Sequence, residues 1–471
     1  MSRIRGARTA RGRLALVPLV ALLLVPAQAG AADRFAAPDG DGAEPCLQAD
    51  PCPLVVAVEG AGIGDDVTLL GGVPPAAPYT TSALVTVSGG ITVHGAPGAR
   101  PLVVGNPTSN FTFRVNQGSV LRDVAIDHQE INNTGVFVVG GLVERVFSKS
   151  AGSSGCTADG GAVIRDSVCW TTSSASSSAG INVQWNVGFT SEATLRNVTA
   201  VSTGAGAGLR VVGATLPNIH VTAHATNVIA RGGGSSDGVA QGSGCCTGVI
   251  SEVILDHSNY DSELEDDTNA DARITDPGSG TNVTAEPVFV DAAAGDFRQA
   301  VSSTATINRG TAAVVQGTGL GLLDLDGDTR NLGLAPDIGA DEFPAPPAPT
   351  GLSVAPASGS DENSPRVSGT APGAATVELF TDAACTASVA AGSAAEFEGA
   401  GIPVAVPDNS TTTFWAQSAD SGGFLSACST ASVTYSEVTP SSPPTPPPTS
   451  GANLGPTGQR AAALRKCAKI K

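Results

Sequence analysis

Carboxylates crowd two segments of the chain and are the side chains best suited to hold a metal ion. Seven acids lie within sixteen residues of one segment, and three more alternate around Gly327 in the other. The two sets are Asp256, Asp261, Glu263, Glu265, Asp266, Asp267 and Asp271, and Asp324, Asp326 and Asp328. Oxygen ligands of this kind bind Ca²⁺, which is the one cofactor that the sequence suggests. We favour a solvated acidic insertion for the first set and a structural turn for the second, with Ca²⁺ binding as the alternative for each.

Aromatic rings with neighbouring amides are the residues best suited to bind a sugar, because a flat apolar ring complements the C–H face of the sugar. The chain has only three Trp and three Tyr. Trp170 and Trp185, with Gln184 and Asn186 beside the second ring, are our candidate carbohydrate-binding residues. Packing of the rings between structural repeats is the alternative that we favour.

The elements that must position these residues are short strands. From about residue 53 to 343, apolar β-branched runs alternate with Gly, Ser, Asn and Asp, without a helical period. A four-residue unit recurs with starts 22, 21, 31, 30 and 30 residues apart, at 121–124, 143–146, 164–167, 195–198, 225–228 and 255–258. A repeat of one strand pattern and one polar turn predicts a solenoid whose rungs share a core. A stack of β-sandwiches would require domain-scale linkers, which this stretch lacks.

The first residues indicate export. Residues 1–31 have the three-part order of a secretory signal peptide: an Arg-rich start, an apolar run of about thirteen residues, and small residues at the end. A membrane span needs about twenty apolar residues, so we expect no membrane span. We therefore expect a secreted or cell-surface protein.

The charge balance narrows the class of partner. The net charge of −18 includes ten cations near the two chain ends, so the segment between them carries −28. An acidic body repels nucleic acid and anionic membranes, and we expect neither as a partner.

Export makes disulfides the expected state of cysteines that lie close together. We expect three bridges, Cys46–Cys52, Cys156–Cys169 and Cys385–Cys428. The sequence does not decide the pairing of Cys245, Cys246 and Cys467. No CxxC or His-Cys spacing supports metal binding at these cysteines.

The opening and closing segments of the strand-rich region resemble those of a known family. Residues 64–70 and 91–101 look like the first rungs of secreted right-handed parallel β-helix proteins of the pectate-lyase-like superfamily. Residues 286–291, 295–298, 324–330 and 336–343 are similar to the closing segment of bacterial surface β-helix proteins of the choice-of-anchor type, although 304–308 departs from that pattern. The resemblance implies an all-β fold with a right-handed parallel β-helix solenoid over residues 45–343.

The same resemblance suggests one pair of candidate catalytic residues, Asp127 and His128. The segment 124–128 resembles a Trp-Ile-Asp-His segment of pectate lyases, whose Asp binds Ca²⁺, but Ala125 stands where the Trp should be. The Arg-rich segment that supplies the base in those enzymes is missing, and so is the Gly-His-Gly of polygalacturonases. An ordinary rung turn is therefore the alternative that we favour.

The C-terminal quarter of the chain differs in composition. A Pro-rich linker at 344–349 precedes residues 350–436, which resemble a bacterial immunoglobulin-like β-sandwich. Residues 437–459 form a Pro/Ser/Thr-rich spacer that cannot form a core, and 460–471 form a basic tail.

The sequence therefore predicts a monomeric, exported β-helix protein that binds an extracellular polysaccharide or cell-wall polymer without catalysis. A Ca²⁺-dependent polysaccharide lyase or a glycosidase is the first alternative, and a passive adhesin or surface scaffold is the second. The sequence identifies neither the polymer nor the mode of wall attachment.

Overall fold

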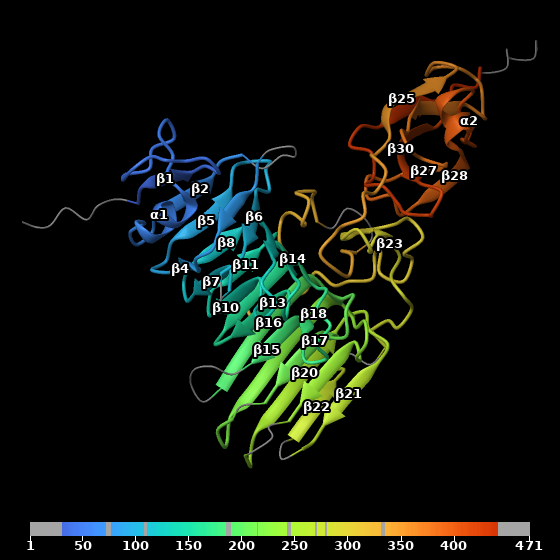
Figure 1. Cartoon of the computed structure of the whole chain (residues 1–471). Helices are drawn as coiled ribbons and strands as arrows, with labels where there is room; N and C mark the ends of the chain where they lie inside the picture. The colour runs from blue at the N-terminus through green and yellow to red at the C-terminus, as the bar shows by residue number, and fades with distance from the viewer. Residues whose placement is uncertain are drawn as a thin grey trace, which may run out of the picture.

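The computed structural model of the chain describes residues 31–71, 77–107, 111–184, 190–213, 215–242, 246–268, 271–277, 280–330 and 335–440. The strands stack from the N-terminal end, shown in blue, to the yellow strands at the other end of the solenoid, and an orange domain follows (Figure 1). The signal peptide apart from Ala31, most of the spacer, the basic tail, Trp185, Asn186, Cys245 and Cys467 lie outside the described residues.

The solenoid is built from parallel strands in two sheets. The large sheet begins each rung with one column of strands: β1 (Asp33–Ala36), β2 (Asp66–Leu69), β5 (Thr92–Gly95), β8 (Val120–Arg122), β11 (Leu142–Glu144), β14 (Ala162–Thr171), β16 (Thr190–Ser202), β18 (His220–Arg231), β20 (Ile250–Asp256) and β22 (Asp271–Thr275). Its second column contains β3 (Tyr79–Thr81), β6 (Leu102–Gly105), β9 (Ala125–His128), β12 (Phe147–Ser150) and the later halves of β14, β16 and β18.

The second sheet closes each rung. It contains β4 (Val85–Val87), β7 (Phe113–Asn116), β10 (Val136–Val139), β13 (Cys156–Asp159), β15 (Ala179–Gln184), β17 (Ala207–Val212), β19 (Gly238–Gln241) and β21 (Glu263–Asp266). Neighbouring strands pair in parallel with aligned positions, as in Cys156↔Ile181 and Ile181↔Leu209. Parallel pairing between successive rungs in both sheets confirms the expected β-helix.

The six rungs of the large sheet that carry the recurring sequence unit bend at its third residue. These residues all have positive φ, between 46° and 56°, and we call them the bend column: Asp123, Arg145, Asp166, Asn197, Asn227 and His257. Asn and Asp tolerate this left-handed conformation better than most residues. Their side chains also link the rungs, because Asn197 Nδ2 donates to Asp166 Oδ1 (3.0 Å) and Asn227 Nδ2 donates to Asn197 Oδ1 (2.8 Å).

Alternation along the strands places one continuous core inside the coil. In β8, for example, Leu121 is fully buried while Val120 and Arg122 on either side of it point outward. The short helix α1 (Leu54–Glu59) packs Leu54, Ala57 and Val58 onto the first rungs (Figure 1). The sequence predicted that the solenoid begins at residue 45. Because β1 already belongs to the large sheet, the solenoid begins earlier than that.

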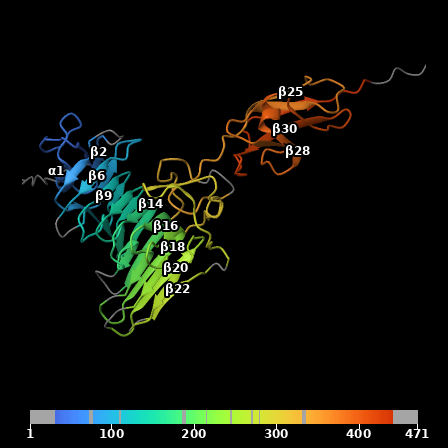
Figure 2. The same cartoon turned by 45° about the vertical axis from the view of Figure 1, so that its right-hand side comes forward.

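A closing segment, residues 286–343, runs back along the outside of the large sheet. It begins with the antiparallel pair β23 (Phe289–Asp291) and β24 (Asp296–Gln299). An apolar cluster joins it to the sheet, with Phe297, Leu325 and Ala340 from the closing segment and Val168, Trp170 and Val201 from the sheet. Figure 2 shows this segment beside β14, β16 and β18.

The C-terminal domain consists of antiparallel strands with a core of its own. One sheet contains β25 (Thr350–Ala355), β26 (Arg366–Thr370) and β29 (Ile402–Pro403), and the other contains β28 (Ser388–Ser393), β27 (Thr376–Phe380), β30 (Thr411–Ala419) and β31 (Val433–Ser436). The short helix α2 (Ala394–Glu398) buries Phe397 in this core. This two-sheet architecture agrees with the predicted sandwich, while its immunoglobulin-like character remains a resemblance.

All three expected disulfides form, at Cys46–Cys52, Cys156–Cys169 and Cys385–Cys428. The second of them joins β13 to β14 inside the solenoid, where both cysteines are buried. In the described part of the chain, no helix is long and apolar enough to cross a membrane.

Candidate binding groove

The outward side chains of the large sheet form columns that run across the rungs. Parallel register places His94, Arg122, Glu144 and Arg165 beside one another on β5, β8, β11 and β14. Two residues earlier in the same strands, Val120, Leu142 and Val163 form an apolar column. Adjacent strands lie about 4.8 Å apart, so each column is a closely spaced row of side chains.

A polar cleft of about 470 Å³ opens where the first column meets the closing segment. Its wall on the solenoid contains His94, Arg100, Arg122, Asp123 and Arg145. The opposite wall is formed by the closing segment at Leu323, Leu325, Asp326 and Gly327. Three arginines therefore line one cleft of a protein whose net charge is −18.

Two of these arginines are already held by neighbouring groups. Arg145 donates to Asp123 through Nε (2.6 Å) and Nη2 (3.0 Å), and its Nη1 lies 3.0 Å from a Glu144 oxygen. These acceptors raise the pKa of Arg145 more than burial lowers it, so its charge is permanent. Arg100 Nη2 donates to the Leu325 carbonyl and lies 3.1 Å from Asp326 Oδ1, which fixes the closing segment to the solenoid.

Arg122 differs from its neighbours because its guanidinium is not engaged. The described residues contain no carboxylate within 4.0 Å of it, and its side chain is partly exposed inside the cleft. Glu144 lies next to Arg122 in register, but it already forms an ion pair with Arg145. It also accepts a hydrogen bond of 3.0 Å from Arg165 Nε. A guanidinium with open donors can take a carboxylate in bidentate fashion.

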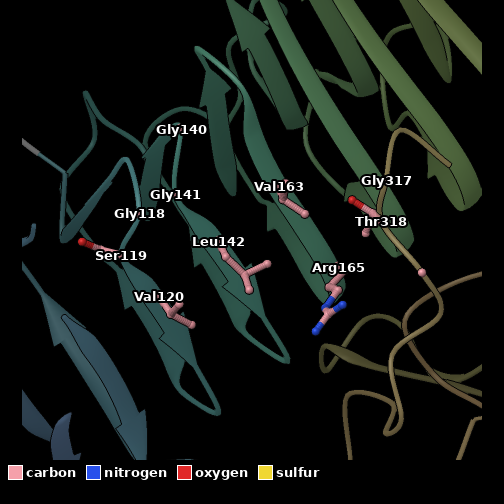
Figure 3. A pocket seen from close by; sticks show the side chains of 11 residues that line it. Gly118, Ser119, Val120, Gly140, Gly141, Leu142, Val163, Arg165, Gly317 and Thr318 are labelled. Atoms are coloured by element: carbon pink, nitrogen blue, oxygen red, sulfur yellow. The ribbon is translucent and has the colours of Figure 1, made fainter. Parts of the chain in front are cut away.

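An apolar cavity of about 340 Å³ continues the cleft toward later rungs. Figure 3 shows Val120, Leu142 and Val163 in a row across neighbouring strands, with Arg165 at the end of the row. Residues 317–319 of the closing segment border it beside Arg165 (Figure 3). We call the cleft and this cavity together the groove. The cleft lies over β5, β8 and the bend residues Asp123 and Arg145, and the cavity lies over β8, β11 and β14 on the neighbouring rungs.

The candidate catalytic residues Asp127 and His128 do not come together. They are adjacent on β9, and alternation turns His128 into the core, where its ring is fully buried and its Nδ1 lies 2.9 Å from Thr112 Oγ1. Burial lowers the pKa of His128, which keeps the ring neutral. Asp127 points outward, with Lys149 Nζ 3.9 Å away. The side chains of Asp127 and His128 therefore point to opposite faces of β9 and do not meet at one site.

The candidate ring Trp170 is 6% exposed and lies in the apolar cluster beneath the closing segment. It meets Phe297 edge to face with ring centroids 5.4 Å apart, and its Nε1 donates to Thr203 Oγ1 (2.8 Å). Trp170 is therefore a packing residue, as the alternative to carbohydrate binding predicted. Its ring offers no open face to a sugar. Gln184 ends β15 on the second sheet and accepts a hydrogen bond from Asn182 (2.9 Å).

In both acidic sets, carboxylates accept hydrogen bonds from backbone N–H groups. Several carboxylates of the first set accept backbone N–H groups at the last rung, such as Glu265 from Ile274 (2.6 Å) and Asp267 from Ala272 (3.0 Å). Glu263 and Asp266 lie on the edge strand β21, and Asp261 precedes it. Charges on an edge strand discourage pairing with another chain.

In the second set, Asp324 accepts N–H groups from Asp326 (3.0 Å) and Asp328 (2.8 Å), which makes a structural turn. Nowhere in the described residues are three His, Cys, Asp or Glu side chains grouped so that they could hold a metal ion. The structure therefore gives no support to a Ca²⁺ site in either set.

Sequence reasoning missed the groove, although one signal was present. The second residue of the recurring unit is Arg122, Glu144, Arg165 and Arg196 in four successive repeats. A charged residue repeated at one outward position indicates a charged column along the solenoid. The opposite wall could not be foreseen, because Leu325 is 225 residues from Arg100 along the chain.

Comparison with known proteins adds little to this description. No protein-family model matches the chain, and no curated protein matches it in sequence. Among solved structures, a crystal structure of pectate lyase Pel9A aligns with 66% of this chain and 96% of that chain, at 15% sequence identity and a TM-score of 0.33. A likeness of that size carries no argument about function, so the β-helix assignment rests on the strand pairing alone.

Proposed function

We propose that this protein binds an acidic polysaccharide outside the cell, through the groove, and does not cleave it. The observation that carries the proposal is the unengaged guanidinium of Arg122 in a cleft lined by three arginines. In a protein of net charge −18, a polyanion would be repelled except where cations are concentrated. The predicted signal peptide and the disulfides support an extracellular location.

The shape of the groove suits a linear polymer. Its apolar column, Val120, Leu142 and Val163, runs across three rungs and can pack against the C–H faces of sugar rings. The arginines at its border can pair with the acid groups of the same chain. This combination of an apolar floor and a few charged groups is typical of ligand sites.

Binding without cleavage is proposed because the carboxylates of the groove are occupied. Asp123 and Glu144 accept hydrogen bonds from Arg145 and Arg165, so neither is free to hold a Ca²⁺ ion against an acidic sugar, and the described residues contain no group of three acids that could do so. Asp127 and His128, the pair suggested by the sequence, point to opposite faces of β9, and His128 is buried in the core.

The test is a panel of uronic-acid polysaccharides and neutral polysaccharides, with and without Ca²⁺. The mature protein should be retained by one or more uronic-acid polymers and by no neutral one, with no rise in ultraviolet absorbance from unsaturated products. Arg122→Gln should weaken retention at least about tenfold, because one charge-assisted pair contributes roughly 1.5–3 kcal/mol.

The matched control is Arg298→Gln, which removes an exposed arginine paired with Asp296 on the closing segment. It should retain the polymer as the wild type does. Rising absorbance would replace the proposal with a lyase, and absence of retention by every polymer would favour a passive scaffold.

A further inference from the structure

The charged column of the large sheet continues beyond the open groove. Register aligns Arg165 with Arg196 on β16, and Val163 with Thr194. At β16 the column is covered by residues 309–322 of the closing segment, which we call the strap. The strap is anchored at Thr311, whose carbonyl accepts from Arg196 Nη2 (2.5 Å) and Asn227 Nδ2 (2.9 Å).

Arg196 under the strap is a buried cation with only one of its three nitrogens hydrogen-bonded among the described residues. Its side chain is completely buried, and two of its donor nitrogens, Nε and Nη1, have no hydrogen-bond partner in the described residues. Burial lowers the pKa of Arg196 to about 10, although the nearby charge of Asp166 opposes this effect. An unsatisfied buried charge is costly, so its presence calls for an acceptor that arrives with a ligand.

The strap is held at its two ends and has few contacts between them. At the ends, Gly310 donates to the Pro336 carbonyl (2.8 Å), Thr311 donates to Asn227 Oδ1 (2.8 Å), and the Leu322 carbonyl accepts from the Arg330 N–H (3.1 Å). Between them, Gln316 Nε2 lies 3.4 Å from His224 Nδ1. Apart from the bridge between Val315 and Thr318, its described residues form no strand pairing. Two of its apolar side chains face solvent, since Val314 is 67% exposed and Leu322 is 85% exposed, while Val315 and Leu320 are half-buried. On the side toward the sheet it presents small residues, including Gly321 beside Asp166. Segments with so little buried apolar surface are the ones that open locally at low cost.

We propose that a long acidic polysaccharide displaces the strap and extends along β16, where its acid group pairs with Arg196. The proposal rests on the proposed function of the groove and deepens it, because it makes Arg196 a determinant of ligand length. Arg122 and Arg196 are three strands apart in register, or about 14 Å at the usual strand spacing. A short acidic oligosaccharide would reach only the open groove.

The experiment compares a short and a long uronic-acid oligosaccharide from the polymer that binds best. Wild-type protein should bind the long one about tenfold tighter, as expected for one added ion pair in a buried setting. Arg196→Gln should bind both equally, with its affinity for the short one unchanged. Arg210→Gln is the control, since Arg210 is a partly buried arginine on the second sheet, away from the strap.

Hydrogen–deuterium exchange of residues 312–316, which belong to the strap and do not border the groove, supplies a readout that a purely structural role of Arg196 would not change. Exchange should rise when the long oligosaccharide binds and stay constant with the short one. Thermal unfolding of Arg196→Gln checks that the variant is folded, because loss of the bond to Thr311 and removal of a buried charge act in opposite directions on its stability.

The outcomes separate the two proposals. Equal affinity for both lengths, with unchanged strap exchange, would overturn the role of Arg196 and leave the groove as a binding site. Loss of binding to both lengths in Arg122→Gln, together with the length effect in the wild type, would support both. Absence of binding by the wild type would overturn the proposed function, and the inference with it.

Discussion

At the scale of single residues, the closing segment is held by charges that are rarely buried. Arg330 is almost completely buried and donates to Asp166 Oδ1 over 2.9 Å, with Glu342 Oε2 3.5 Å away. Around it lie Asp324 and Asp341, whose pKa values are raised, chiefly by burial. The packing of the segment therefore depends on which of these groups carry charge.

Asp341 gives a prediction for pH. Burial raises the pKa of Asp341 from 3.8 to about 7, so the folded state binds this proton more tightly than the unfolded chain does. Its contribution to stability is thus complete below about pH 4 and is lost as the pH rises through about 7. Between pH 5 and 8 the wild type should lose on the order of 2 kcal/mol that Asp341→Asn does not lose.

Denaturant unfolding at the two pH values measures this difference. Asp328→Asn serves as the control, because Asp328 is exposed on the same segment. If the stability of the wild type and of Asp341→Asn depended on pH in the same way, Asp341 would not be the group responsible.

Arg330 gives a second prediction at this scale. Arg330→Met leaves the buried carboxylates of Asp166 and Glu342 without their cation, and should lower the free energy of unfolding by about 3–5 kcal/mol. Arg298→Met removes an exposed ion pair and should cost less than about 1 kcal/mol. Equal effects of the two substitutions in urea unfolding would show that the closing segment is not held by Arg330.

At the scale of elements, the bend column fixes how each strand pair of the large sheet turns. Asn197 is its central member, with φ of 52° and one hydrogen bond to the rung on each side. The column also sets the groove, because Arg122, Glu144 and Arg165 each lie one residue before a bend.

Mutation of Asn197 can distinguish two contributions to stability, the left-handed backbone conformation and the side-chain hydrogen bonds between rungs. Asn197→Gly removes two side-chain hydrogen bonds and should cost about 1–3 kcal/mol. Asn197→Ala removes the same bonds and puts a residue with a Cβ but without the tolerance of Asn for the left-handed region at φ of 52°, which should cost about 1 kcal/mol more than Gly does. Thermal unfolding should show the wild type as the most stable, then Asn197→Gly, then Asn197→Ala. An Ala variant more stable than the Gly variant would argue against backbone strain at this position.

The bends could be predicted from the sequence, and the groove only in part. Asp123, Asp166, Asn197 and Asn227 repeat in a constant sequence context, so local preference and tertiary structure agree there. Arg145 adopts the same bend without a local preference for it, because Asp123 and Glu144 hold its side chain. The strap has no periodic pattern, and its anchor joins Arg196 to Thr311 across 115 residues. Contacts of that kind depend on the folded solenoid and leave no local signal.

At the scale of the whole molecule, the two largest cores of the described residues are separate. One lies inside the solenoid, and the other lies between the sheets of the C-terminal domain. The two parts meet at few points, including the rings of Phe343 and Phe424, whose centroids are 5.1 Å apart. We therefore expect the groove to function without the C-terminal domain.

The Cys385–Cys428 bridge tests this division. It closes 43 residues within the C-terminal domain, so replacing both cysteines with Ser should destabilise that domain by about 4 kcal/mol. Calorimetry should show a lower transition temperature for one unfolding step and an unchanged one for the solenoid. A joint shift of both transitions would show that the two cores unfold together.

The most direct test of the central claim is to locate the bound polysaccharide on the protein. Hydrogen–deuterium exchange with saturating short uronic-acid oligosaccharide should slow in residues 94–100, 120–123, 142–145 and 323–327, which border the groove. The same protection should be absent in Arg122→Gln. Protection confined to the outer face of the second sheet, around Arg210 and Gln241, would place the ligand elsewhere and contradict the account.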